Sequence, residues 1–82
     1  MFRFYNGQAA DAKVKLHLTD REQEVLHCLV QGASNEEIAT QLYISVATVK
    51  AHLTAVFHKL GVTSRTQAII RALKMGLATG RR

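Results

Sequence analysis

Three capping boxes mark helix starts in this 82-residue chain. A capping box pairs a serine or threonine with a glutamate or glutamine three residues later, and each side chain satisfies a backbone N–H that the helix leaves free. The three boxes occupy residues 19–22, 34–37 and 64–67. The chain has no proline to interrupt the segments that follow them, and Gly32, Gly61 and Gly76 can adopt the positive φ that ends a helix. The sequence therefore predicts an all-α fold with short connections.

Apolar residues recur at helical spacing after each of these starts. Ser45 is a good N-cap for a further helix over about 46–60, which makes four predicted helices. Cys28, the only cysteine, lies among apolar neighbours and is expected to be a small buried hydrophobe. The side chains expected to face a shared core are Val25, Leu26, Leu29, Ile38, Ala39, Leu42, Val49, Leu53, Val56, Phe57, Leu60, Thr66, Ile69, Ile70 and Leu73.

The second and third predicted helices have the spacing of a helix-turn-helix. Three residues, 43–45, separate them, and the small Ala39 lies midway along the first, where a second helix can cross closely. The turn of this motif often contains a glycine, whereas here Tyr43 takes the place of the glycine. If Tyr43 adopts a positive φ, it carries a strain of about 1–2 kcal/mol, which burial of its ring could offset.

The stretch 44–60 has a second face that differs from its apolar one. Small and polar residues lie there, with nothing bulky enough to hold it away from a flat or concave partner. A helix-turn-helix presents its second helix to the major groove of DNA, so we expect this face to enter the groove. The face consists of Ala47, Ala51, Thr54 and His58, with Lys50 on its edge.

Individual side chains on this stretch suit particular parts of DNA. Lys50 can donate to guanine O6 and N7 or to phosphate, Ala51 can pack on a thymine methyl, and Thr54 can bond a base edge. Ser45 and Thr48, beside the free N–H groups of the helix start, suit a phosphate. Two alternatives remain: Thr48 makes a hydrogen bond within the helix start, and Lys50 is simply solvated.

The distribution of charge favours a polyanionic partner. Residues 1–44 carry four Lys/Arg and six Asp/Glu, a net charge of −2, whereas residues 45–82 carry seven Lys/Arg and no acid, a net charge of +7. An acid-free basic half is typical of a nucleic-acid-binding surface, although a solvated basic helix face would look the same. A membrane-surface role fits less well, because the apolar faces recur in several short helices.

The sequence argues against an enzyme, a metal site and a cofactor. A chain of this size buries too little surface to enclose a large pocket, and no nucleophile–base pair or glycine-rich phosphate loop is visible. The four histidines lack metal-ligand spacing, and a single cysteine excludes an internal disulfide and a multi-cysteine site. No stretch has the length of a membrane span or signal segment, so we expect a cytoplasmic protein.

Four motifs in register resemble the LuxR-type DNA-binding domain. They are LTDREQEVL at 18–26, GASNEEIA at 32–39, ISVATVKAH at 44–52 and KLGVTSRTQA at 59–68. The same domain occurs in response regulators of the NarL and FixJ group and in small regulators resembling GerE. The resemblance covers about residues 16–78. It implies a four-helix LuxR-type helix-turn-helix domain, with a linker at 1–15 and a basic tail at 79–82.

The resemblance also implies roles for particular residues. The family's base contacts fall on Lys50, Ala51 and Thr54, although many members carry a longer polar or basic residue at the position of Thr54. Its last helix, here about 64–75, commonly forms a symmetric dimer. The implied DNA backbone contacts are Ser45, Thr48, His58 and Lys59, and the implied dimer contacts are the outward residues Ala68, Arg71, Ala72 and Met75.

The leading hypothesis is a bacterial transcriptional regulator that binds promoter DNA as a two-fold dimer, with RNA polymerase as a further partner. One alternative is a protein-interaction module whose last helix binds a partner; chemical-shift mapping would then perturb residues 64–77 instead of 45–58. Another is sigma-factor region 4, which opens with a similar run but fits residues 48–52 poorly. The sequence leaves open whether the chain is a whole protein or an output domain, and which signal it answers.

Overall fold

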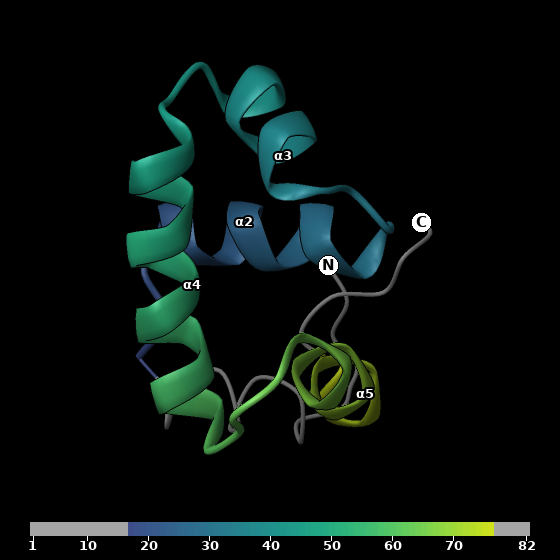
Figure 1. Cartoon of the computed structure of the whole chain (residues 1–82). Coiled ribbons are helices and arrows are strands. Elements are labelled where there is room, and N and C mark those ends of the chain that lie inside the picture. Colours follow the sequence, from purple (N-terminus) through teal and green to yellow (C-terminus); the bar gives the residue numbers. More distant parts are fainter. Residues whose placement is uncertain (1–16, 77–82) are drawn as a thin grey trace.

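The computed structural model describes residues 17–76, and its secondary structure there is entirely helical. The predicted all-α fold is confirmed. The linker predicted at 1–15 and the tail predicted at 79–82 lie outside the described residues. The helices are α2 (Asp20–Val30), α3 (Asn35–Leu42), α4 (Val46–Leu60) and α5 (Arg65–Met75). Figure 1 shows α4 running along one side of the molecule, with α2 crossing its middle, α3 at one end and α5 at the other.

Two of the three predicted capping boxes form completely. Thr19 Oγ1 accepts from the Glu22 N–H at 3.1 Å and Glu22 Oε1 accepts from the Thr19 N–H at 3.0 Å. Ser34 and Glu37 repeat this exchange at 3.1 and 2.8 Å. These reciprocal bonds satisfy N–H groups that no helix turn can reach, so α2 and α3 begin where the sequence predicts.

The third capping box is only half formed. Ser64 Oγ accepts from the Gln67 N–H at 3.1 Å, as predicted. However, Gln67 Oε1 accepts from the Thr63 N–H at 3.0 Å, one residue before the N-cap. The serine is therefore the N-cap of α5, while the glutamine side chain fixes the loop that leads into it.

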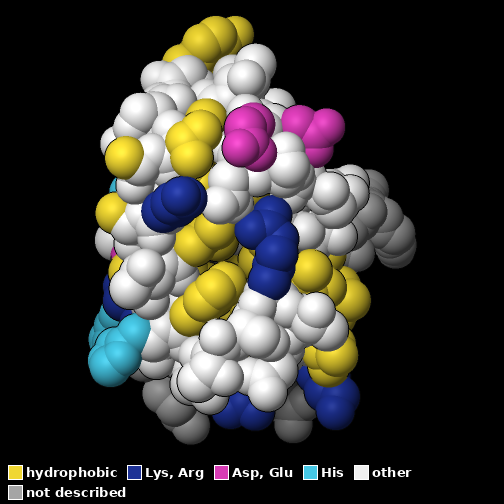
Figure 2. Space-filling model, in the orientation of Figure 1, with side chains coloured by type: hydrophobic (Ala, Val, Ile, Leu, Met, Phe, Trp, Pro, Cys, Tyr) yellow, Lys and Arg dark blue, Asp and Glu magenta, His cyan; other side chains and the backbone are white. Residues whose placement is uncertain are grey.

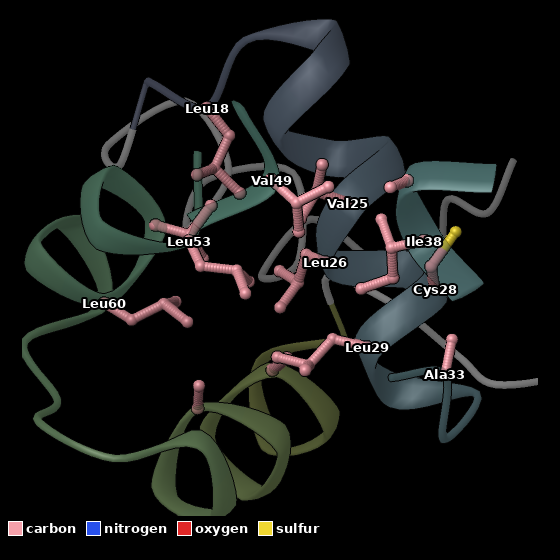
Figure 3. Packing of buried hydrophobic residues seen from close by; sticks show 14 residues of the cluster. Leu18, Val25, Leu26, Cys28, Leu29, Ala33, Ile38, Val49, Leu53 and Leu60 are labelled. Carbon is pink, nitrogen blue, oxygen red and sulfur yellow. The ribbon is translucent and has the colours of Figure 1, made fainter. Parts of the chain in front are cut away.

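The core lies between the four helices. Val25, Leu26, Leu29, Ile38, Val49 and Val56 are each 0% exposed, and Figure 3 shows the labelled side chains from α2, α3 and α4 pointing into one shared space. Cys28 is buried as predicted, and its thiol lies 3.3 Å from Gln41 Oε1. Burial raises the pKa of the Cys28 thiol, and the charge of Glu24 raises it further.

The predicted orientation of α5 is wrong in part: Ile69 packs against the core and Arg71 is exposed, as expected, but other residues are reversed. Ala68 and Ala72, expected to face outward, are fully buried, and Met75 is half-buried against the core. Ile70 and Leu73, expected to face inward, are each 49% exposed, and Thr66 is exposed. The physical reason is close packing: α5 lies against both α2 and α4, and small side chains allow its backbone to approach them.

Arg65 fixes the start of α5 in a way that the sequence did not indicate. Its guanidinium donates to Asn35 Oδ1 at 2.8 Å and to the Ala33 carbonyl at 2.6 Å. Asn35 is the first residue of α3 and Ala33 lies in the loop just before it, thirty or more residues earlier in the chain than Arg65. No local pattern signals such a contact, because only the tertiary fold brings the two segments together.

Tyr43 adopts the positive φ that its place in the turn raised, but its ring is not buried. It ends α3 in the left-handed region, with φ 60° and ψ 44°, whereas its side chain is 93% exposed. The strain of about 1–2 kcal/mol is therefore not offset by packing of the ring.

Replacing Tyr43 with glycine should stabilise the fold by about 0.5–1 kcal/mol, because glycine adopts this conformation without strain but loses more entropy on folding. Thermal unfolding should show a midpoint raised by a few degrees. Tyr43→Ala is the matched control: it removes the ring but keeps the β-carbon, so it should change stability little. A destabilised glycine variant would show that the exposed ring stabilises the turn.

Candidate nucleic-acid interface

The α3–turn–α4 unit has the geometry of a helix-turn-helix. Tyr43, Ile44 and Ser45 form the connection, as predicted, and the Ile44 N–H donates to the Ala39 carbonyl at 3.0 Å. Ala39 is 7% exposed, and Ile38 and Val49 are fully buried. The small side chain at 39 thus lies inside the α3–α4 packing, and the two helices hold a fixed mutual orientation.

The outer face of α4 is open to solvent over its length. All five residues of the second face are exposed: Ala47, Lys50, Ala51, Thr54 and His58. Behind them, Val49, Leu53, Val56 and Leu60 anchor the helix in the core, while Phe57 is half-buried. The predicted separation of the two faces is confirmed. Because the exposed side chains are short except at Lys50 and His58, a partner can approach the helix backbone closely.

Ser45 and Thr48 form a linked hydroxyl pair at the start of α4. Ser45 Oγ accepts from the Thr48 N–H at 3.0 Å and lies 2.9 Å from Thr48 Oγ1. Both residues are exposed. One hydroxyl proton lies between the two oxygens, which leaves the other proton free for an outside acceptor such as phosphate. The helix-start bond expected as an alternative role for Thr48 therefore exists and is compatible with a DNA contact.

Lys59 is held by contacts within the fold. Its ammonium donates to Glu22 Oε1 at 2.7 Å and to the His17 carbonyl at 3.0 Å, and its side chain is 29% exposed. The charge is thus engaged in holding the end of α4 against the start of α2. The structure gives Lys59 a tertiary ion pair that the sequence did not indicate, and its contact with DNA stays a prediction.

The Glu22 carboxylate is the other half of this ion pair. Burial alone raises the pKa of Glu22 and is the largest single effect. The hydrogen bonds from Lys59 and from the Thr19 N–H, with the positive charges of Lys59 and His52, together outweigh it. The pKa of Glu22 therefore lies below its ordinary value, and the folded protein favours the charged form.

Replacing Glu22 with glutamine should destabilise the domain by about 1–2 kcal/mol at neutral pH, because Lys59 loses a charged hydrogen-bond partner. Glu37→Gln is the matched control, since it makes the same change at the same capping-box position of α3, where the side chain is exposed. Chemical denaturation of both variants measures the difference. Equal effects would show that the capping box, not the ion pair, carries the stabilisation.

The same pair makes stability depend on pH. Because the folded-state pKa of Glu22 lies below the unfolded-state value, about 4.3, the stabilisation is fully present above that value. It is lost as the pH falls through the lowered pKa. The stability advantage of the wild type over Glu22→Gln should therefore shrink on acidification and persist at neutral pH.

The positive charge of residues 45–82 is less concentrated at α4 than the net charge of that half suggests. Lys59 and Arg65 serve tertiary contacts, and Arg71 and Lys74 lie exposed on α5. Figure 2 shows Lys and Arg side chains spread over this view of the molecule, with the visible acidic side chains over α3. Among the exposed residues of α4, the positively charged side chain is Lys50, and His58 is exposed about two turns further along the helix.

The described residues provide neither a metal site nor a membrane span. Between residues 17 and 76, no three His, Cys, Asp or Glu side chains lie close enough together to hold a metal ion. None of the helices in that range is both long and apolar enough to cross a bilayer.

A four-helix domain whose helix-turn-helix exposes a narrow, polar second helix defines a class of DNA-binding domain. Residues 16–72 match the family described as "Bacterial regulatory proteins, luxR family". The chain belongs to this family, and the predicted resemblance is confirmed. It is a LuxR-type DNA-binding domain of transcription regulators and not an enzyme.

Two relatives show how this domain is used in proteins of different length. The chain is 48% identical over 59 residues to the spore germination protein GerE of Bacillus subtilis. The aligned region covers 72% of this chain and 80% of GerE. The chain is also 45% identical over 77 residues to the response regulator protein VraR of Staphylococcus aureus. That aligned region covers 94% of this chain but only 37% of VraR.

Solved structures agree with this assignment. The structure of the transcription factor GerE matches with a TM-score of 0.70 at 41% identity, covering 77% of this chain and 94% of that one. The response regulator ChrA of a heme-sensing two-component system matches with a TM-score of 0.70 at 50% identity, covering 73% of this chain and 30% of ChrA. The fold and the family thus agree from independent comparisons.

Proposed function

We propose that α4 enters the major groove of promoter DNA and reads bases through Lys50, Ala51 and Thr54. The observation that carries this proposal is the exposed face of α4, where a lysine stands among short side chains on a helix anchored by its opposite face. Ser45 and Thr48 lie beside this face and His58 lies on it, and the three supply phosphate contacts. Such contacts position a helix, while the base contacts specify the sequence.

A mobility-shift titration with promoter duplexes at several salt concentrations tests this function. Each neutralised phosphate releases counterions, so the logarithm of affinity should fall linearly with the logarithm of salt concentration, with a slope of about −0.9 per phosphate. Binding that does not respond to salt, or no binding at all, would contradict the proposal.

We also propose that two copies bind paired half-sites about one helical turn apart, ~10 bp, through α5. The dimer contacts implied by the sequence need correction, because Ala68 and Ala72 are fully buried. Ile70 and Leu73 are the large apolar side chains of α5 that are exposed. Ile70 and Arg71 also line a shallow hollow of about 310 Å³. We therefore assign the contact to Ile70, Leu73 and Arg71.

Replacing Ile70 with aspartate should weaken binding to a paired site about tenfold or more, because two copies would bring their carboxylates together. Binding to a single half-site should change little, since α5 lies outside the proposed DNA surface. Sedimentation of the protein–DNA complex gives the stoichiometry. An unchanged two-to-one complex of undiminished affinity would place the dimer contact elsewhere or remove it.

The relatives suggest two settings for this domain. The chain covers 80% of the length of GerE. It covers only 37% of the response regulator VraR and 30% of the response regulator ChrA. We propose that the chain acts as the DNA-binding output domain of a regulator in the bacterial cytoplasm. There it regulates transcription by RNA polymerase at the promoters to which it binds. Sequencing of the DNA recovered with the protein from cells would identify those promoters.

A further inference from the structure

The hydroxyl of Thr54 is already engaged inside α4. Thr54 lies one helical turn after Lys50, and its Oγ1 donates to the Lys50 carbonyl oxygen at 3.0 Å. A hydroxyl has one proton to donate and two lone pairs that accept. Because the proton is used within the helix, Thr54 presents only acceptor lone pairs to a molecule docked on this exposed face.

The bases of DNA respond differently to an acceptor in the major groove. Adenine N6 and cytosine N4 carry amino groups that donate, whereas guanine O6 and N7 and thymine O4 only accept. An acceptor facing guanine or thymine makes no hydrogen bond unless Thr54 first gives up its bond to the Lys50 carbonyl. The bond inside the helix therefore carries sequence information.

We propose that Thr54 selects a base with a major-groove amino group, adenine or cytosine, at one position on the strand it faces in each half-site. This inference rests on the proposed docking of α4 in the major groove and adds the kind of base that is read. Every base pair has one amino group in the major groove, so the selection fixes which strand carries it. Thr54 thus helps to set the orientation of the half-site.

Lys50 has the opposite hydrogen-bonding character. Its ammonium has three donors and no acceptor, so it favours guanine O6 and N7. Four residues of helix separate Lys50 from Thr54, a rise of about 6 Å, which is comparable to two base-pair steps of about 3.4 Å. The half-site should therefore combine an acceptor-rich base for Lys50 with an amino-bearing base for Thr54 within about two base pairs.

Selection of duplexes from a random pool tests this reading with the full chain. The wild type should enrich adenine or cytosine at one position near the enriched guanine, and Thr54→Val, which keeps the shape but removes the hydroxyl, should lose that preference alone. Thr40→Val is the matched control, because Thr40 Oγ1 makes the same bond to the Glu36 carbonyl at 3.0 Å on α3. It should leave the selected sequence unchanged.

Removal of the amino group itself gives a sharper test. Purine in place of the selected adenine, or 2-pyrimidinone in place of the selected cytosine, should weaken wild-type binding about three- to tenfold and leave Thr54→Val binding unchanged. An equal loss for both proteins, or enrichment of guanine or thymine at this position by the wild type, would overturn the inference while leaving DNA binding intact. No enrichment together with no salt-dependent binding would overturn the docking of α4 itself.

Discussion

Replacing Ala68 with aspartate is expected to remove a large part of the free energy of unfolding of the domain. Ala68 is 0% exposed, on the face of α5 that packs toward α2 and α4. An uncompensated buried charge costs about 3–5 kcal/mol, which is comparable to the total stability of a domain of this size, of the order of 5–10 kcal/mol. Circular dichroism during urea denaturation measures the loss.

The neighbouring substitution Ile70→Asp provides the contrast. Ile70 is 49% exposed, so its carboxylate would stay hydrated, and the expected cost is only about 1 kcal/mol of lost apolar contact. The two variants differ in position by two residues and introduce the same side chain. If Ala68→Asp cost less stability than Ile70→Asp, the result would support the orientation of α5 that the apolar pattern predicts.

Replacing Lys50 with alanine is expected to weaken specific DNA binding by about 1–3 kcal/mol, roughly five- to 150-fold. Lys50 is exposed beside Ala51 on the outer face of α4. Its ammonium can donate to both acceptors of one guanine, and no nearby exposed cation on that face replaces it. Equilibrium titration against the preferred sequence and against single-base variants of it measures the effect.

The sequences for which Lys50→Ala loses affinity distinguish a contact with a base from electrostatic attraction to phosphate. A base-reading lysine should lose affinity chiefly for the preferred sequence, whereas a phosphate-binding lysine should weaken all sequences equally and reduce the salt slope by about one. Lys74→Ala removes the same charge from the exposed surface of α5 and should have little effect on base preference. An unchanged dissociation constant for Lys50→Ala would show that Lys50 is solvated in the complex.

Helix starts and the recognition helix were predictable because their causes are local. The N-caps at Thr19, Ser34, Ser45 and Ser64 act within three residues of chain, and α4 has the predicted bounds. Its two faces differ strongly in residue size, so periodicity alone separates them. The family motifs also lie within these local segments, which explains why the class of protein followed from the sequence.

The sequence by itself determined the four helices, the helix-turn-helix and the face of α4 that is open to solvent. Only the tertiary structure decided the rotation of α5, the engagement of Lys59 with Glu22, and the exposure of Tyr43. Each of these depends on which distant segments pack together. Apolar pattern favours the larger side chains as the buried ones, whereas close helix packing buries the small ones, Ala68 and Ala72, and leaves Ile70 and Leu73 at the surface.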